Sequence, residues 1–353
     1  MGRKYLVMYS SLNHLPRTIL ILIIGLNLAK CSSDRLDISI ENKSVDIPLL
    51  RMDQDWPVGF ASGKVAQSIN ERLLSKYGLL YELFIQKMIQ EGSVHDPMIG
   101  DNLYSRLKSD ALMMEVVPEL HQTFRDFSAY KKELDQAMNY YQHYFPDSTL
   151  PNKYITFFSY FNAQAMVIND DLCIGLDMYL GSNHPIVKKL PVLDFPQFFK
   201  DKMEEKYLVA NALKAWLLEK MYQCHGNDFL DKIVAAGKIM YLMDAIMPQV
   251  DPEIKMSYTK EEYQWAIMNE DNIWQQLVEQ DVLYSKEDML EINWISDGPF
   301  TKGLPTDSPS RMGIWMGWQM VKDFMVANPE VSLNELVIES NSKRILKYYD
   351  PKE

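Results

Sequence analysis

Hydrophobic residues recur at helical spacing over two long segments in the first half of the chain. Residues 65–89 are rich in apolar side chains at this spacing. A second set is related by steps of mostly three or four, with charged residues in between: Leu120, Phe124, Phe127, Leu134, Met138, Tyr141 and Phe145. This period is that of an amphipathic α-helix. We therefore predict helix over 65–89 and one helix over 118–145, begun by Pro118 and stopped by Pro146.

After Pro151 the pattern changes to short runs that are rich in β-branched and aromatic residues. Three such runs follow one another: 153–160, 163–169 and 172–180. Turn-forming pairs separate them, and the second pair is Asn169-Asp170, whose side chains can bond their own backbone. The runs predict a three-stranded antiparallel meander. Gly175 in the third strand marks a bulge or a close backbone approach.

Helical periodicity then returns. Long helices are predicted over 195–222 and 227–247, and Pro248 ends the second. Two capping boxes mark further helix starts: Thr259 with Glu262, and Ser332 with Glu335. The first of these opens a helical segment over 259–284.

Between these helices, residues 296–310 form a loop of Gly, Pro, Ser and Asp, and loops this long are often functional. In the helix that follows, Gly313 and Gly317 lie one turn apart and leave a flat face for close helix packing. The fold class that emerges is α+β, mostly helical with a small antiparallel β-sheet. We predict a single domain over 61–350, preceded by an extended tether over 31–60.

The first thirty residues have the pattern of a secretory signal. A start with three basic residues and no acidic one precedes the twelve-residue apolar run "TILILIIGLNLA", which is too short to span a membrane. The run ends in Leu28-Ala29-Lys30-Cys31, which looks like a bacterial lipobox, although a small residue is preferred where Lys30 stands. We therefore predict a lipoprotein signal peptide over 1–30 and a membrane-anchoring lipid on Cys31. The alternative is an ordinary signal with an incidental cysteine.

The charge of the chain excludes one class of partner. The 353 residues carry a formal net charge of -12, and loss of residues 1–30 removes four basic groups and no acidic one, which gives -12 - 4 = -16. Because the sequence has no cluster of basic residues, it does not predict the positively charged surface that binds nucleic acid. Anionic headgroups would also repel it, so the lipid must provide the anchoring. Cys173 and Cys224 remain; we expect two separate buried thiols, with a disulfide as the alternative.

Local catalytic motifs are absent from the sequence. No histidine is followed by Glu, so there is no HExxH zinc motif, and neither a nucleophile elbow nor a phosphate loop occurs. A distributed metal site remains as an alternative, assembled from Asp170, Asp171, Asp177 and His184. The other interpretation is that these aspartates cap a turn. Cys224 beside His225 is read either as catalytic or as a helix end.

Paired tryptophans offer a different kind of site. Trp315 and Trp318 lie on one predicted helix, where they either pack in the core or line an aromatic groove. Arg311, at the exit of the 296–310 loop, can orient a carboxylate of a partner or pair with a neighbouring aspartate.

Five segments, in this order, together resemble the gliding-motility lipoprotein family GldB of Bacteroidetes: "INDDLCIGLDMYLG", "GKIMYLMDAIMP", "NEDNIW", "VLYSKED" and "SPSRMGIWMGWQMVKDFM". The similarity runs from about 45 to 350. The resemblance implies a scaffold like that of predicted zincin-like zinc proteases. The helix that carries HExxH in those proteins corresponds to 207–221, where Val209, Ala210, Asn211 and Leu213 stand instead. The resemblance also implies a role in the gliding machinery, which in these bacteria is linked to type IX secretion.

We therefore predict a non-catalytic envelope lipoprotein that binds other motility or secretion proteins, without cofactor or metal. Its expected location is the periplasmic face of the inner or outer membrane. The expected partner groove comprises Asp170, Asp171, Asp177, Asn211, Lys238, Arg311, Trp315 and Trp318. One alternative is a zincin-like hydrolase with an atypical metal site, and another is a purely structural lipoprotein.

Overall fold

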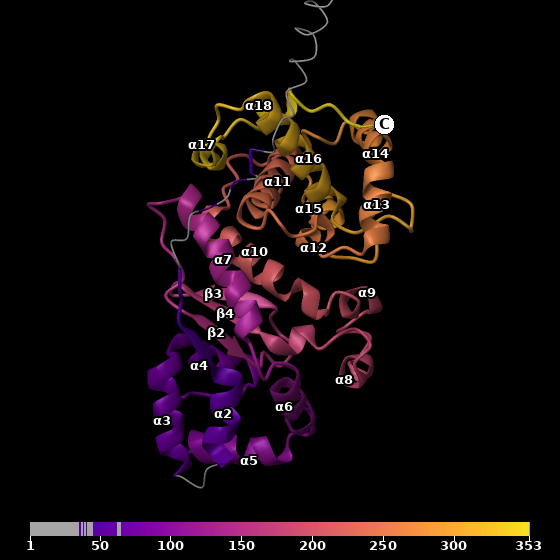
Figure 1. The fold of residues 1–353 in the computed structure, drawn as a ribbon. Coiled ribbons are helices and arrows are strands. Elements are labelled where there is room, and N and C mark those ends of the chain that lie inside the picture. Colours follow the sequence, from indigo (N-terminus) through magenta and orange to yellow (C-terminus); the bar gives the residue numbers. More distant parts are fainter. Residues whose placement is uncertain (1–34, 37, 39, 41–44, 62–64, 353) are drawn as a thin grey trace, which may run out of the picture. The chain divides into compact units, whose positions relative to one another are not determined.

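The computed structural model describes residues 35, 36, 38, 40, 45–61 and 65–352. All elements named below belong to Ile40–Glu353, which forms one compact unit. Helices dominate it, and a small sheet accompanies them (Figure 1), so the predicted α+β class is confirmed. The predicted signal peptide and Cys31 lie outside the described residues.

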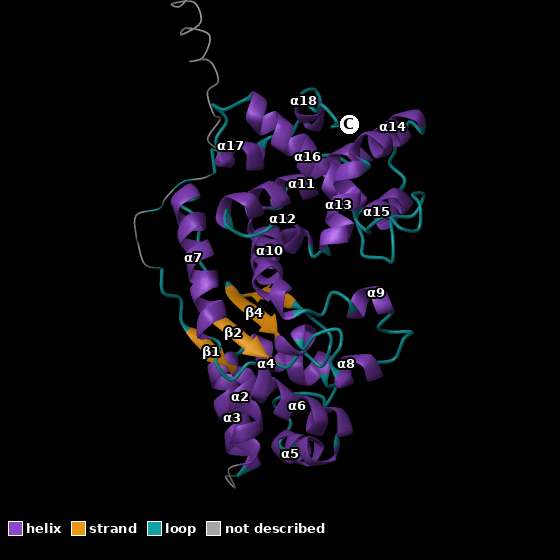
Figure 2. Cartoon of the chain, turned by 45° about the vertical axis from the view of Figure 1, so that its right-hand side comes forward, coloured by secondary structure: helices purple, strands orange, loops and turns teal. Residues whose placement is uncertain are grey.

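The sheet has four strands in the order β1-β2-β4-β3. Figure 2 labels β1, β2 and β4, and Figure 1 labels β3 beside β4. The strands are β1 (Leu49–Arg51), β2 (Tyr154–Phe157), β3 (Ala165–Ile168) and β4 (Asp171–Gly175). β1 and β2 are parallel, β2 and β4 are parallel, and β3 runs antiparallel to β4. The predicted antiparallel meander is therefore wrong in its topology. Residue alternation indicates which face of a strand is buried, but β2 is buried throughout and its partners are set by packing against distant segments.

The turn between β3 and β4 confirms the local part of that prediction. Asn169 and Asp170 both adopt a left-handed conformation, with φ of 50° and 64°, as a two-residue hairpin turn requires. Gly175 is a close backbone approach, because a Cβ there would lie 2.0 Å from the carbonyl oxygen of Ala163. The strand ends at this glycine, and a 3-10 turn, η2 (Leu176–Tyr179), replaces the rest of the predicted third strand.

The segment predicted as a tether to residue 60 is part of the fold from β1 onward. Leu49 pairs with Tyr154 in the sheet, and α2 (Met52–Ala61) packs against β2. Trp56 and Phe60 of α2 are 2% and 1% exposed, so this helix is anchored by large buried side chains. Pro57 and Gly59 interrupt its helical pattern, which explains why the sequence did not indicate a helix here.

Both long helices predicted in the first half are broken. Gly78, with φ of 52°, separates α3 (Ala66–Tyr77) from α4 (Leu79–Leu83), which continues as a single π-helical turn, η1 (Phe84–Met88). α5 (Ile99–Ser109) follows. The second helix is divided into α6 (Ala111–Thr123) and α7 (Ser128–Tyr144). Pro118 lies inside α6 and does not begin a helix. The connection keeps Phe124 and Phe127 buried, so the apolar period continued across the break.

The second half is built around three long helices: α10 (Leu208–Met221), α11 (Phe229–Ile246) and α16 (Met312–Ala327). α10 packs against β3 and β4, and α11 lies along α16 (Figures 1 and 2). A Cβ on Gly317 would lie 1.8 Å from the carbonyl oxygen of Ile233, and one on Gly237 would lie 2.1 Å from the carbonyl carbon of Gly317. The predicted close packing at Gly313 and Gly317 is confirmed, with Gly237 as its counterpart on α11.

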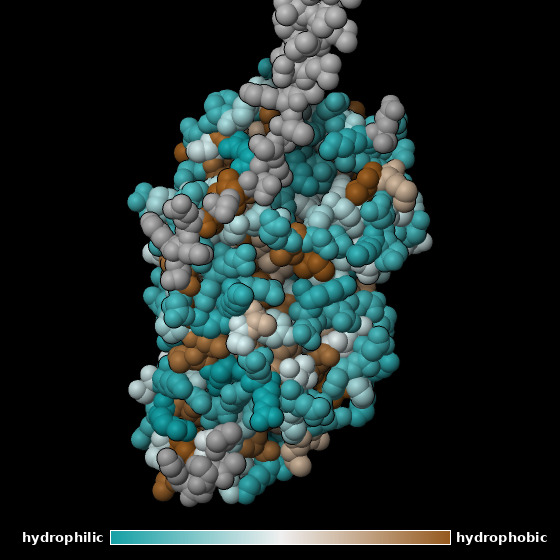
Figure 3. All heavy atoms as spheres, in the orientation of Figure 1, coloured by the Kyte–Doolittle hydropathy of each residue, from teal (hydrophilic) through white to brown (hydrophobic). Residues whose placement is uncertain are grey.

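Short helices complete the unit, and both predicted capping boxes are formed. The segment after η2 holds α8 (Pro185–Lys189), α9 (Gln197–Lys200) and η3 (Glu205–Tyr207). The remaining helices are α12 (Pro252–Met256), α13 (Lys260–Met268), α14 (Glu270–Glu279), α15 (Asp288–Trp294), α17 (Leu333–Ile338) and α18 (Ser342–Leu346). None of the helices in the described part of the chain is long and apolar enough to cross a membrane. Figure 3 shows a mostly hydrophilic face with separate apolar patches.

Candidate ligand-binding cavity

A cavity of about 250 Å³ lies beside the carboxyl end of β4. Gln164 opposes the last residue of that strand, since its carbonyl accepts the N–H of Gly175 at 3.0 Å. Ligands of open sheets with parallel strands commonly bind at this end. Polar side chains line one part of the cavity: Gln164, Lys202, Asn211, Lys214, Ser257, Asp297 and Arg311. Apolar side chains line the rest: Ala165, Phe198, Phe199, Ala215 and Leu218.

Arg311 is held in a strained conformation at the start of α16. Its φ of 62° lies in the left-handed region, which is uncommon for a residue with a side chain. Its Nη2 donates to the carbonyl of Met256 at 2.5 Å, and its Nε lies 3.0 Å from Oδ1 of Asp297. The side chain of Arg311 is 11% exposed and that of Asp297 is 55% exposed, so the pair spans from the interior to the rim.

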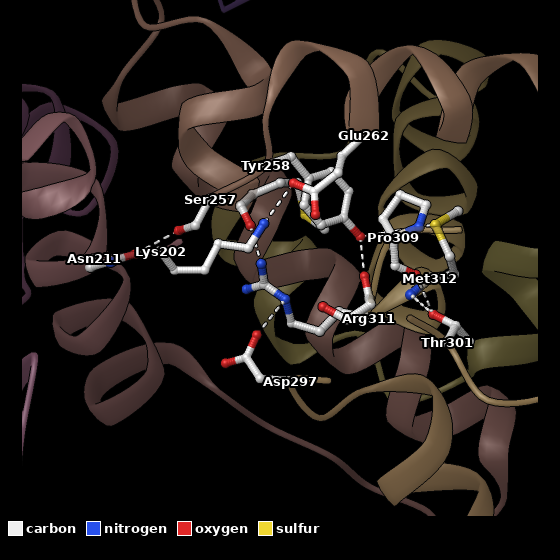
Figure 4. A network of polar contacts seen from close by, with 12 residues as sticks. Lys202, Asn211, Ser257, Tyr258, Glu262, Asp297, Thr301, Pro309, Arg311 and Met312 are labelled. Atoms are coloured by element: carbon white, nitrogen blue, oxygen red, sulfur yellow. Dashed lines mark hydrogen bonds and ion pairs between the residues drawn. The ribbon is translucent and has the colours of Figure 1, made fainter. Parts of the chain in front are cut away.

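Hydrogen bonds on both sides of Arg311 fix this backbone geometry (Figure 4). The hydroxyl of Thr301 donates to the carbonyl of Pro309 at 2.8 Å and accepts the N–H of Met312 at 3.1 Å. The hydroxyl of Tyr258 donates to the carbonyl of Ser310. Strained backbone conformations persist only where surrounding contacts hold them in place, and they occur most often at functional sites.

A second cation, Lys202, faces the same aromatic ring as Arg311. Its Nζ donates to Oε2 of Glu262 at 2.6 Å, and the same oxygen accepts the N–H of Thr259 in the capping box of α13. Lys202 and Arg311 lie 5.4 Å and 5.5 Å from the centroid of the Tyr258 ring, within cation–π range. Burial lowers the pKa of Lys202, while the carboxylate of Glu262 opposes that shift.

Lys214 is the third cation and differs from the other two. Within the described part of the chain, no hydrogen bond or ion pair is formed by its ammonium. Burial and, second, the positive charge of Arg311 lower the pKa of Lys214 to about 7. The carboxylate of Asp297 opposes this shift but is already paired with Arg311, so the ammonium has no counter-ion of its own in a partly desolvated site, where an unpaired charge is costly.

Amide and hydroxyl groups connect the cavity wall. The side-chain amide of Asn211 donates to Oε1 of Gln164 at 3.4 Å, and the hydroxyl of Ser257 donates to Oδ1 of Asn211 at 2.9 Å. Ser257 itself has φ of 52° and ends α12 in a left-handed conformation. The lining thus combines cations, neutral hydrogen-bonding groups and aromatic rings, which is a set suited to holding an anion with an apolar part.

A family model described as gliding motility protein GldB matches residues 33–351. The chain belongs to this family. It is therefore a lipoprotein related to gliding motility, and the family points to the cell envelope and to contact with components of the motility machinery. No curated protein and no solved structure matches the chain. The resemblance to zincin-like proteases stays a prediction.

The structure brings two of the eight predicted groove residues of this GldB-family chain to the cavity, Asn211 and Arg311. The aspartates of the β3–β4 turn lie elsewhere. Asp170 pairs with Lys220, and Oδ2 of Asp171 lies 3.3 Å from Nζ of Lys153, so both act as surface ion-pair partners.

The other four predicted residues are buried and cannot line a groove: Asp177, Lys238, Trp315 and Trp318 are 0%, 5%, 2% and 0% exposed. Asp177 accepts the N–H of Ser159 at 2.7 Å and its hydroxyl at 2.9 Å, and also the N–H of Phe161. Lys238 donates to the carbonyls of Val337 and Glu339. These side chains satisfy buried backbone groups, which is a structural role.

Of the two interpretations of Trp315 and Trp318, packing in the core is the one that the structure confirms. Trp315 and Trp318 stack edge to face, and Nε1 of Trp318 donates to Asp244 at 2.8 Å. Arg311 pairs with a neighbouring aspartate, Asp297. Cys173 and Cys224 are free thiols, as expected, but only Cys173 is buried, and Cys224 is half-buried. Over the described residues no three His, Cys, Asp or Glu side chains converge as metal ligands do.

The sequence interpretation missed Lys202, Lys214 and Asp297. A signal for Lys214 was present: it lies three residues after Asn211, so both occupy one face of α10. All other residues from Leu208 to Leu218 in that helix are apolar. Two polar residues on one face of an otherwise apolar helix therefore indicate a polar site.

Proposed function

We propose that this GldB-family lipoprotein is a non-catalytic binding component of the gliding and type IX secretion machinery. A lipid on Cys31 holds it at a membrane, and the cavity at Arg311 receives a segment of a partner protein. The observation that carries this proposal is the strained Arg311, fixed on both sides by hydrogen bonds and directed at an open cavity with an unpaired lysine.

The composition of the lining favours binding over catalysis by a hydroxyl or thiol nucleophile. Such a nucleophile is typically activated by an adjacent base within hydrogen-bond reach. The described lining residues include no imidazole or thiol, and the hydroxyl of Ser257 donates to an amide, not to a base. The carboxylate of Asp297 is paired with Arg311. Cations with aromatic neighbours are instead typical of recognition sites.

The test is the replacement of Arg311→Gln in the chromosomal copy. We expect normal amounts of lipoprotein and a loss of gliding, since the cavity loses its central cation. Arg344→Gln is the matched control, because Arg344 pairs with Glu339 outside the cavity and its side chain is 47% exposed. Normal gliding with Arg311→Gln at normal abundance would refute the proposal.

The runner-up, a hydrolase with an atypical metal site, is tested by the metal content of the full chain, purified in detergent without chelator or histidine tag. About one zinc per chain would revive the hydrolase. The binding proposal expects a metal content well below one per chain.

A further inference from the structure

The cavity contains one positive charge without a counter-ion. Arg311 is matched by Asp297, and Lys202 is matched by Glu262. Lys214 has no such match, so three cations face two carboxylates. The whole chain carries a net charge of -12, and a positively biased cavity is therefore a local feature and not a consequence of composition.

The wall beside these cations is apolar. Phe198 and Phe199 come from α9, and Leu218, which is 47% exposed, comes from α10 one turn after Lys214. The volume of about 250 Å³ is below the roughly 300–1,000 Å³ of sites for drug-sized ligands. The cavity therefore fits a small group that has an anionic end and an apolar side, and not an extended cofactor.

We propose that the cavity binds the carboxylate of a C-terminal residue with an apolar side chain, and that Lys214 is the residue that pairs with this carboxylate. The inference rests on the proposed binding function and names the ligand chemistry of the same site. Arg311 and Asn211 orient the carboxylate from neighbouring positions, and the aromatic wall of α9 contacts the side chain of the ligand residue.

Charge balance favours a carboxylate over a phosphate. One unpaired ammonium is neutralised by a monoanion, whereas a phosphate group carries about -1.5 to -2 charges near neutral pH. The excess negative charge would remain partly desolvated beside Asp297 and Glu262. Capture of a C-terminal carboxylate is an established mode of peptide recognition, and the chain of the ligand can leave through the open mouth of the cavity.

The lysine gives the site a pH dependence. The charged groups that face Lys214 across the cavity are Arg311, Asp297 and Lys202, and the remaining polar lining is neutral. Because the pKa of Lys214 is about 7, the ammonium form declines as the pH rises from 6 to 8. A carboxylate binds the ammonium form, so affinity falls over the same range.

The test is a titration of the full chain, purified in detergent, with acetyl-Ala-Ala-Ala-Phe that has a free C-terminus. The same peptide with a C-terminal amide, N-acetylphenylalanine and inorganic phosphate are titrated in parallel. We expect the free acid to bind at least about tenfold more tightly than the amide, which lacks the charge-assisted contact, and than phosphate, which has excess negative charge and no apolar part. Tighter binding of the tetrapeptide than of N-acetylphenylalanine would identify the C-terminus of a polypeptide as the ligand. Equal affinities would identify a free carboxylic acid and overturn the C-terminal assignment.

Two lysines on α10 provide a matched pair of variants. Lys214→Met is expected to weaken binding of the free acid about tenfold or more and to abolish its decline between pH 6 and 8. Lys220→Met removes the same charge from the same helix, but Lys220 pairs with Asp170 outside the cavity, so binding should be unchanged.

Equal binding of acid and amide, no binding at millimolar peptide, or an unaffected Lys214→Met variant would overturn the ligand assignment. Each of these results leaves the gliding test with Arg311→Gln valid, so the two proposals fail separately.

Discussion

The contact between α11 and α16 gives a prediction whose size follows from the backbone geometry. A Cβ on Gly317 would lie 1.8 Å from the carbonyl oxygen of Ile233 and 2.5 Å from its carbonyl carbon. Both obstacles are backbone atoms of α11, which cannot move aside as the end of a flexible side chain can. Gly317→Ala therefore has to push two of the longest helices of the chain apart.

Two opposing effects decide the size of the change. Alanine is better than glycine in a helix interior by about 1 kcal/mol. Inserting a methyl group into a packed core costs about 1–3 kcal/mol, and more where the backbone must shift. Here α16 also has to withdraw buried side chains such as Trp315 and Trp318 from their contacts. We expect the losses to outweigh the gain, so that the free energy of unfolding falls by roughly 1–3 kcal/mol.

Urea unfolding of the full chain, followed by tryptophan fluorescence, measures this change, because Trp315 and Trp318 lie on α16. Gly298→Ala is the control, since a Cβ there has its nearest neighbour at 3.3 Å, in a loop. Its effect should stay within about 0.5 kcal/mol. If Gly317→Ala were as stable as the control, the close helix contact would not exist as described.

Three further outcomes are expected. Burial raises the pKa of Asp177 to about 6 from 3.8, so the folded state binds this proton more tightly than the unfolded state. The contribution of Asp177 to the free energy of unfolding therefore decreases as the pH rises from about 4 to 6 and is not regained above that range. In a plot of the free energy of unfolding against pH, Asp177→Asn should remove this decrease. Lys238→Met leaves the carbonyls of Val337 and Glu339 without their donor. It should lower the free energy of unfolding by about 1–3 kcal/mol in the same urea assay. An unchanged urea midpoint would contradict these buried contacts. Cys31→Ser should move the lipoprotein from the membrane fraction to the soluble fraction; retention in the membrane fraction would refute lipid anchoring.

Local signals in the sequence predicted local structure well. The capping boxes at Thr259 and Ser332 formed because each involves groups only three residues apart. The Gly313 and Gly317 spacing predicted a close helix contact, since two glycines one turn apart lie on the same helix face and leave it flat, although the sequence did not indicate that α11 is the partner. The hairpin turn at Asn169 also depends only on its own backbone.

Features that depend on distant contacts were not predicted. The position of β2 between β1 and β4 depends on segments far apart in the chain, which periodicity does not reveal. Trp315 and Asp177 were both included in the expected groove, yet packing places both in the core. Arg311 was found because it follows a long loop, whereas Lys214 was missed because a single lysine on a helix is ordinarily solvent-facing, although it shares a face of an otherwise apolar segment with Asn211.

The burial of Asp177 and Trp315 also changes what substitutions there can test. Because Asp177 holds three hydrogen bonds and Trp315 is packed against Trp318, their replacement is expected to destabilise the fold before it affects binding. Loss of gliding in such variants says nothing about a binding surface. Substitutions at the cavity itself are required.

The central claim is that the cavity at Arg311 and Lys214 is where this lipoprotein binds its partner. The most direct measurement compares the gliding speed of cells that carry Lys214→Met with that of cells that carry Lys220→Met, at equal abundance of the lipoprotein. The account predicts that gliding is lost with Lys214→Met and normal with Lys220→Met, since only Lys214 lines the cavity. Equal gliding in the two strains would contradict it.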